Sequence, residues 1–456
     1  MSDIRDLLFH TAGLAAAHLE ELDERPVFPQ LSADDLRARV ADELPEEPID
    51  PQIVVEELAT AVAPGLVAIP GGRYFGFVTG SSVPGALAAD WLVSAWDQNA
   101  GNYVGSPAAS IVEDITAGWI KELLGFPSEA SVAFVTGTQM AHVTCLAAAR
   151  QEVLQREGWD VPRRGLWEAP RIRVIAGEKR HVTVDRALRM LGIGTDAIEE
   201  VPADDMGRIR TDALAAALAN GSGPTIVVAQ AGEVNTGSFD PLPEINEIAG
   251  HHNAWVHVDC AFGVWVRVSA ELGYLVEGLE SADSWSVDAH KWLNVPYDSG
   301  IAVVAHPEPH RVSMLGEAAY LVPTTTERDS YHWTPELSRR ARGIPVYCAI
   351  RSLGRQGIAR LIERCCAHAR RFATGLAEIP GVEILNDVVL NQVLFRFADD
   401  EETNRVLDTV QRSGEAWMGG TEWDGRHAIR ISVSSWATTE EDVMRTITAF
   451  QNAATS

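Results

Sequence analysis

The middle of the chain carries short apolar runs separated by stretches long enough for a helix. Runs of this length, bounded by small and polar residues, are typical of strands buried inside a sheet. They begin near residues 132, 173, 225, 255, 284 and 301. Strands that alternate with helix-length segments favour a mainly parallel sheet between layers of helices, and such sheets bind ligands at the carboxyl ends of their strands. We therefore expect an α/β protein with a three-layer large domain.

The two ends of the chain show different patterns. In residues 1 to about 63, apolar residues recur at helical spacing between proline-rich joints, which predicts helices with little core of their own. The last part alternates helices with strand-like pieces and predicts an α+β domain. Its expected elements are a helix at 352–376, strands at 382–385, 393–397 and 428–433, and a helix after residue 438. We divide the chain into a helical N-terminal arm at 1–70, a large domain at 71–335 and a small C-terminal domain at 336–456.

Composition narrows the class of protein. The 456 residues are too many for one compact core, and the net charge of −27 argues against binding to nucleic acid or to an anionic membrane. The longest hydrophobic stretch, Pro84–Trp96, is interrupted by Asp90 and is too short to cross a membrane. The first residues lack the order of a signal peptide, and the five cysteines are an odd number without metal-type spacing. We expect a cytoplasmic protein with reduced thiols and no bound metal.

Candidate chemistry begins in residues 283–300, where Lys291 stands between a histidine and a tryptophan. An apolar run that reads as a buried strand follows this segment. Lysine is strongly hydrated, so a chain that buries one must neutralise it or use it. One use is an imine with a carbonyl cofactor, because loss of hydration lowers the pKa of the amine and frees its lone pair. Taken alone, the segment fits a solvated turn better.

A second signal lies 32 residues before the lysine. Residues 255–259 alternate as a strand that ends on Asp259, and an acid in that place is what pyridoxal phosphate needs to keep its ring nitrogen protonated. The combination of His-Val-Asp-Cys-Ala with Asp-Ser-Trp-Ser-Val-Asp-Ala-His-Lys-Trp resembles the group II pyridoxal-phosphate decarboxylases, the family of aromatic amino acid and glutamate decarboxylases. The resemblance extends from about Gly72 to about Gly357.

The resemblance implies the fold-type I pyridoxal-phosphate transferase fold, with Lys291 as the Schiff-base lysine and Asp259 as the partner of the ring nitrogen. It also implies that His181 stacks on the ring and that Gly137 and Thr138 hold the phosphate. Around residue 137 a strand and a small-residue turn lead into a helix that we expect to run through residue 149, and this arrangement suits an anion on its own, because amides and the helix dipole face it. Without the lysine and the acid, Thr138 would be only a helix cap and His181 a structural histidine.

Further cofactor contacts are implied by position. The threonine that the family usually has after the third expected strand aligns with Val234, so Asn235 or Thr236 is the candidate for the ring oxygen. The remaining implied contacts are Ala261, Asp288 and His290. The family more often has asparagine where this chain has Asp288, whose charge opposes that of a phosphate dianion.

Residues 321–336 are polar and predict a mobile loop, in the place where the family carries a catalytic lid. Tyr331-His332-Trp333 resembles the lid segment whose tyrosine protonates the α-carbon after decarboxylation, and a phenylalanine there accompanies aldehyde synthesis. Tyr320 is the alternative donor. In the family the N-terminal arm packs on the partner subunit, which implies a homodimer; an arm folded on its own large domain is the alternative.

We interpret the sequence as a pyridoxal-phosphate-dependent carboxy-lyase that converts an L-amino acid into its amine and carbon dioxide. One alternative is an aminotransferase or an amine-oxidising aldehyde synthase on the same scaffold, distinguished by where the proton is added or whether oxygen intervenes. A cofactor-binding regulator without turnover is disfavoured by the lack of a basic patch, and a related carbon–carbon lyase by the lack of a membrane anchor. The identity of the amino acid stays open, because the departures from the family fall on substrate-facing positions.

Overall fold

The computed structural model describes residues 3–316 and 326–455, which form two compact units. The larger unit contains Gly80–Ala369 and Asn386–Gln392. The smaller unit contains Met1–Thr79, Arg370–Leu385 and Val393–Ser456. Tyr320 and the first part of the expected loop at 321–336 lie outside the described residues.

The larger unit is built on a seven-stranded sheet with the order β1-β7-β6-β5-β4-β2-β3. Its strands are β1 (Ser131–Val135), β2 (Arg173–Gly177), β3 (Ile198–Val201), β4 (Thr225–Gln230), β5 (Trp255–Asp259), β6 (Ser284–Asp288) and β7 (Gly300–Val304). All six expected strands are present, and β3 is an additional strand at one edge of the sheet. Apart from β3 and the first residue of β2, every residue of these strands is buried, as is typical of strands in a sheet that is covered on both faces.

The direction of each strand determines at which edge of the sheet its carboxyl end lies. The strands from β6 to β3 pair in parallel, whereas β7 is antiparallel to both of its neighbours, β1 and β6. It follows that β1 runs in the same direction as the parallel strands and that only β7 is reversed. The link between β6 and β7, residues 289–299, consists of turns and loop, which suits an antiparallel return. The mainly parallel sheet is therefore confirmed, and the carboxyl ends of six strands share one edge.

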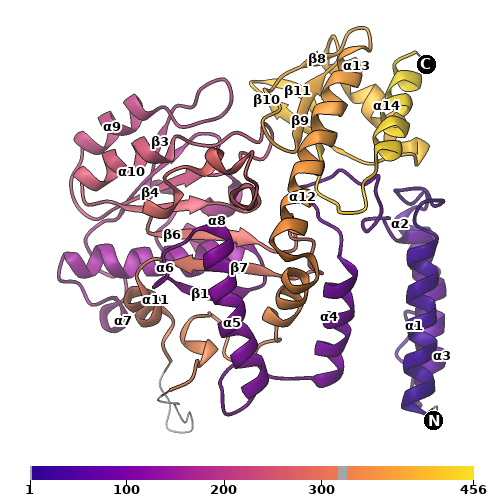
Figure 1. Ribbon diagram of the computed structural model, residues 1–456, viewed down its shortest axis with the longest axis horizontal. Helices are drawn as coiled ribbons and strands as arrows, with labels where there is room; N and C mark the ends of the chain where they lie inside the picture. Colours follow the sequence, from indigo (N-terminus) through magenta and orange to yellow (C-terminus); the bar gives the residue numbers. More distant parts are fainter. Residues whose placement is uncertain (1–2, 317–325, 456) are drawn as a thin grey trace. The chain divides into compact units, whose positions relative to one another are not determined.

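Helices cover both faces of this sheet. The helices of the larger unit are α4 (Pro84–Trp96), α5 (Pro107–Leu124), α6 (Thr138–Arg156), α7 (Val161–Arg164), α8 (Val182–Met190), α9 (Thr211–Ala219), α10 (Leu242–His251), α11 (Pro307–Met314) and most of α12 (Gly343–Ala377). Figure 1 shows α9 and α10 on one side of the sheet and α6 and α11 on the other. Buried residues of α6 and α8 form one core with β1, β2, β4, β5 and β7.

Two helix ends differ from expectation. The expected helix at 352–376 begins nine residues earlier, at Gly343, and is interrupted at Gly354, where φ is 62° and ψ is 170°. This backbone conformation is open to glycine and strained for other residues, so the interruption follows from the residue type. The helix after β1 was expected to end at residue 149 and continues to Arg156.

The smaller unit contains the chain's first helices and a four-stranded sheet with the order β10-β11-β9-β8. Its elements are α1 (Ile4–Glu20), α2 (Ala33–Arg37), α3 (Pro51–Val62), β8 (Glu383–Ile384), β9 (Gln392–Arg396, whose first residue belongs to the larger unit), α13 (Asp400–Ser413), β10 (Gly419–Trp423), β11 (Arg426–Ser432) and α14 (Glu440–Thr455). The three N-terminal helices contain no buried residue, which agrees with an arm that has little core of its own. Among the residues that the structure describes, none of the helices is long and apolar enough to cross a membrane.

Candidate active site

All but one of the sequence-predicted site residues lie at one edge of the seven-stranded sheet. They are Gly137 and Thr138 after β1, His181 after β2, Asn235 after β4, Asp259 and Ala261 at the end of β5, and Asp288, His290 and Lys291 at the end of β6. The carboxyl ends of these strands meet because the strands run in one direction. Tyr331, the exception, lies in the segment between α11 and α12.

The turn between β1 and α6 is shaped by two glycines that face each other. A Cβ atom on Gly300 would lie 2.4 Å from Cα of Gly137, and a Cβ atom on Gly137 would lie 3.0 Å from Cε1 of His290. Only glycine fits such close approaches. The turn leaves the Thr138 amide at the positive end of the α6 dipole, where it donates a hydrogen bond of 2.6 Å to Oδ1 of Asp288. An anionic oxygen thus already occupies the helix N-terminus.

Asp288 also organises the lysine segment. Its Oδ2 lies 3.0 Å from Nζ of Lys291, and its Oδ1 lies 3.4 Å from Nε2 of His290. Burial alone would raise the pKa of Asp288, but the charges of Lys291 and His290 hold the pKa below its usual value. Nδ1 of His290 accepts a hydrogen bond from the Ser299 amide, which leaves Nε2 to carry the ring hydrogen toward Asp288. The expected lysine is therefore held by a carboxylate at the sheet edge.

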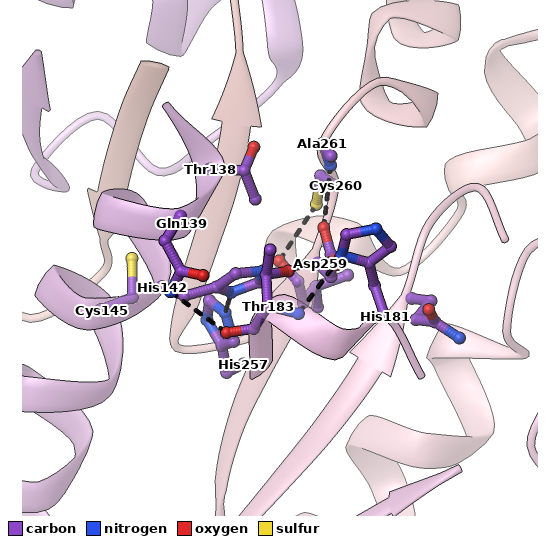
Figure 2. A network of polar contacts seen from close by, with 12 residues as sticks. Thr138, Gln139, His142, Cys145, His181, Thr183, His257, Asp259, Cys260 and Ala261 are labelled. Atoms are coloured by element: carbon purple, nitrogen blue, oxygen red, sulfur yellow. Dashed lines mark hydrogen bonds and ion pairs between the residues drawn. The ribbon is translucent and has the colours of Figure 1, made fainter. Parts of the chain in front are cut away.

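Asp259 is buried at the end of β5 (Figure 2). Its Oδ1 accepts a hydrogen bond of 3.1 Å from the Ala261 amide, and its Oδ2 lies 3.3 Å from Nε2 of His142 on α6. Burial alone would raise the pKa of Asp259. The charge of His142, followed by the charges of His181 and Lys291, instead holds this pKa well below its usual value. Asp259 is ionised at neutral pH, as the partner of a protonated ring nitrogen must be.

A second buried histidine stands behind His142. Nδ1 of His142 lies 2.8 Å from Nε2 of His257, whose Nδ1 lies 2.9 Å from Oγ of Ser284. The Trp255 indole donates a hydrogen bond of 2.9 Å to the same oxygen. Burial and then the charge of His142 lower the pKa of His257 to about 3, so His257 is neutral.

His181 is the N-cap of α8, where its Nδ1 accepts a hydrogen bond from the Thr183 amide and lies 2.7 Å from the hydroxyl of the same residue. The ring is fixed by the start of the helix, and its charge reaches Asp259. The structural role that was considered for a lone histidine at this position is thus present, as a helix cap.

Asn235 belongs to a loop organised by a buried acid. Glu233 accepts hydrogen bonds from the amides of Asn235 and Thr236 and from the side-chain amide of Asn235. The Thr236 hydroxyl also donates a hydrogen bond of 2.8 Å to the Met206 carbonyl. The expected contact of Asn235 or Thr236 with the cofactor stays a prediction.

Tyr331 lies in a short turn, Ser330–His332, and is 5% exposed. Its amide donates a hydrogen bond of 2.8 Å to the Gly101 carbonyl, and its ring centroid lies 4.2 Å from that of His332. The hydroxyl of Ser330 donates a hydrogen bond to Glu113 on α5. These contacts fasten the described part of the expected loop, and none of them involves a residue at the sheet edge.

Three residues with a place in this network were not among those predicted from the sequence: His142, His257 and Glu233. His142 follows Thr138 by four residues, one helical turn, and His257 precedes Asp259 by two residues, on the same face of the strand. These spacings carry a signal for the two histidines, but their contact depends on how α6 lies across β5. Glu233 resembles any polar loop residue in sequence.

Comparisons with known proteins identify the family of this chain. Residues 34–398 match the model of the pyridoxal-dependent decarboxylase conserved domain. Aromatic-L-amino-acid decarboxylase of Bacillus atrophaeus is 27% identical over 96% of this chain and 93% of that protein. 4-Hydroxyphenylacetaldehyde synthase of Rhodiola rosea is 25% identical over 93% of this chain and 90% of that protein. The crystal structure of Oryza sativa TDC with PLP and tryptamine aligns with a TM-score of 0.93 at 23% identity, over 99% of this chain and 98% of that chain.

The fold is that of the pyridoxal-phosphate decarboxylases, as the resemblance implied. Because the matched region covers most of its length, the chain belongs to the pyridoxal-dependent decarboxylase family. It is a carboxy-lyase that uses pyridoxal phosphate to decarboxylate an amino acid.

The residues at the sheet edge fit this cofactor. Within the described part of the chain, the buried hydroxyl oxygens of Thr138, Ser286 and Ser299 have no hydrogen-bond partner. Thr138 begins α6, Ser286 lies on the same face of β6 as Asp288, and the Ser299 amide contacts His290. Unsatisfied buried hydroxyls beside a helix N-terminus suit a ligand with several anionic oxygens, and an ionised Asp259 suits a protonated ring nitrogen.

Proposed function

We propose that Lys291, Asp259 and His181 form the catalytic centre of an L-amino acid decarboxylase, with Lys291 as the residue that carries the cofactor. The observation that supports this most is the position of a carboxylate-held lysine and a buried, ionised acid at the ends of the adjacent strands β6 and β5. If the pair of Lys291 and Asp288 were only structural, it would not require Asp259, a second buried and ionised acid, nearby.

In this proposal the phosphate binds at the N-terminus of α6, near Gly137, Thr138 and His290. The helix dipole, the Thr138 hydroxyl and the facing glycines support this location. Asp288 accepts the Thr138 amide hydrogen bond there, so its negative charge has to be balanced by Lys291 and His290. Ala261 and Asn235 are the further proposed contacts, beside the ring and its oxygen.

When bound, pyridoxal phosphate supplies an electron sink for the electron pair that remains when carbon dioxide departs. Asp259 keeps the proton on the ring nitrogen, which the sink requires. His181, fixed by its cap on α8, would pack against the ring and help to hold the cofactor. Asp288 would hold the Lys291 amine in place whenever that amine is not bonded to the cofactor.

Tyr331 is the proposed donor of the proton to the α-carbon after carbon dioxide has left. Its buried ring and the contacts of its turn support a fixed donor, because proton transfer needs an acid at a defined distance. The rival function is aldehyde synthesis, in which oxygen intervenes before this proton is added. A relative of this chain carries the name 4-hydroxyphenylacetaldehyde synthase, so the product has to be measured.

We further infer a homodimer located in the cytoplasm. The N-terminal helices expose large apolar side chains, among them Ile4, Leu8, Phe9, Ile53 and Leu58. A surface with this many apolar side chains is typical of a protein–protein interface, and a second copy of the chain would bury it. The odd number of cysteines without metal-type spacing supports a reducing compartment. Light scattering on the purified protein distinguishes a dimer from a monomer.

The chain has only three lysines, Lys121, Lys179 and Lys291. Each of them can therefore be replaced in turn to find the lysine that binds the cofactor. Borohydride reduction of the protein loaded with pyridoxal phosphate, followed by peptide mass spectrometry, should find the added mass on Lys291. Lys291→Ala should lack this modification and the visible absorption band of the cofactor bound to lysine, whereas Lys121→Arg and Lys179→Arg should keep both. Modification of another lysine in the wild-type protein would refute the proposed centre.

A further inference from the structure

We propose that His142 is a positioning residue for the decarboxylation: it orients Asp259 and keeps its carboxylate ionised toward the ring nitrogen, while His257 and Ser284 fix the ring of His142. The proposal rests on the proposed role of Asp259. It gives a function to the buried pair of histidines that is drawn beside that acid in Figure 2.

The direction of the hydrogens follows from the two ends of the network. A carboxylate only accepts, so Nε2 of His142 must carry a hydrogen toward Oδ2 of Asp259, 3.3 Å away. At the other end, the Trp255 indole only donates, so it uses one lone pair of the Ser284 oxygen. The hydroxyl can then serve Nδ1 of His257 as donor or acceptor. His142 carries the Nε2 hydrogen in both cases, either as a neutral ring or as a cation.

The surroundings make this contact strong. The side chains of His142 and His257 are 0% exposed, so little water screens their charges. The titratable groups that face His142 are Asp259 and His257 from β5, and His181 and Lys291 also act on the acid. Of these, His142 lowers the pKa of Asp259 most.

The consequence for the reaction concerns one proton. A proton shared between a carboxylate and a ring nitrogen stays on the group with the higher pKa. By keeping the pKa of Asp259 low, His142 keeps this proton on the nitrogen, where it strengthens the electron sink. The contact between His142 and Asp259 lies within ion-pair distance but is not an aligned hydrogen bond, so the neighbours that fix the ring also set its effect.

Two substitutions separate the nitrogens of His142. His142→Asn keeps a polar atom near the position of Nδ1 and loses Nε2, whereas His142→Gln reaches the position of Nε2 and loses Nδ1. His310→Asn is the matched control, because His310 is also 0% exposed and bonds a serine, Ser131, at 2.7 Å. Its other ring nitrogen lies 2.9 Å from the Trp333 carbonyl.

The readout is the affinity of the full-length protein, stripped of cofactor, for pyridoxal phosphate and for an analogue with carbon in place of the ring nitrogen. His142→Asn should weaken binding of pyridoxal phosphate about 10- to 100-fold, the scale on which a nearby opposite charge changes the proton affinity of a carboxylate. Binding of the analogue should change by less than about threefold, since it has no ring proton to hold. His142→Gln should keep most of the discrimination between the two ligands, and His310→Asn should keep all of it. In an Asp259→Asn background, His142→Asn should have no further effect.

If His142→Asn weakens the binding of pyridoxal phosphate and of the analogue equally, His142 has only a structural role. Unchanged binding of both ligands would also overturn the proposal. If His142→Asn fails to fold, His257→Asn, which keeps a polar atom toward Ser284 and loses the contact with His142, should lose part of the discrimination. Full discrimination in that variant would also contradict the proposal. Full discrimination in Asp259→Asn would instead refute the proposed role of Asp259. The two failures are therefore distinguishable.

Discussion

The buried ion pair between Glu113 and Arg339 fastens the segment that carries Tyr331. Nη1 of Arg339 lies 2.7 Å from Oε1 and 2.9 Å from Oε2 of Glu113, and the two side chains are 0% and 1% exposed. Glu113 also accepts a hydrogen bond of 2.7 Å from Ser330, the neighbour of Tyr331. The guanidinium of Arg328 lies nearby, and its pKa is lowered by burial and by the charge of Arg339, while Glu113 opposes both. One carboxylate therefore faces two arginines.

Loss of one partner leaves an uncompensated charge in the interior. Glu113→Gln and Arg339→Met should each cost about 3–5 kcal/mol, the usual cost of breaking a buried pair. In the Glu113→Gln background, Arg339 is an unpaired cation that repels Arg328. Its replacement by methionine should then cost about 2 kcal/mol less than it does alone. Arg340→Met is the control, because its pair with Asp90 is partly exposed and should contribute no more than about 1 kcal/mol.

Hydrogen exchange measured by mass spectrometry tests this locally, in peptides that cover residues 107–124 and 326–336. A loss of about 3 kcal/mol corresponds to exchange at least about 100-fold faster in each single variant. Costs that add within about 0.5 kcal/mol in the double variant would refute the reasoning, because independent sites behave in that way.

Three further outcomes follow from single residues. Burial raises the pKa of Asp240 to about 7 from 3.8. Between these two pH values the folded protein keeps a proton on Asp240 that the unfolded chain loses. The free energy of unfolding should therefore fall by up to about 4 kcal/mol as the pH rises from about 4 to 7. Denaturant unfolding of Asp240→Asn across this range should show a smaller fall, and an unchanged one would contradict the assignment. Gly300→Ala should displace the Gly137 backbone and weaken pyridoxal phosphate binding more than about tenfold in fluorescence titrations, a loss above about 1.4 kcal/mol. Tyr331→Phe should sharply lower amine formation while substrate binding persists and divert part of the product to aldehyde and hydrogen peroxide in air; amine at the wild-type rate would exclude Tyr331 as donor.

The strands that could be predicted from the sequence differ physically from those that could not. The six predicted strands of the large sheet are rich in apolar residues because helices cover both faces of the sheet. The two missed strands, β3 with Ile-Glu-Glu-Val and β10 with Gly-Gly-Thr-Glu-Trp, are at the edges of their sheets. An edge strand pairs on one side and tolerates charged residues and glycine, so its sequence resembles a loop.

The site was predictable to the extent that its residues follow strands. Lys291 and Asp259 come at or just after apolar runs, and a parallel sheet brings such ends together. The contact of His142 with Asp259 joins a helix to a strand more than 100 residues later in the chain, so no local pattern records it. Arg339 lies in a run of basic residues that fits a solvated turn equally well, and only packing against α5 shows that it is buried.

Product analysis tests directly whether the protein decarboxylates an amino acid. The purified protein, loaded with pyridoxal phosphate, is incubated with each L-amino acid in turn, and carbon dioxide and the amine are measured by mass spectrometry, with Lys291→Ala as the control. We expect at least one amino acid to give its amine and carbon dioxide in equal amounts with the wild-type protein and neither product with the variant. Formation of a keto acid without carbon dioxide, or of an aldehyde in place of the amine, would contradict this expectation.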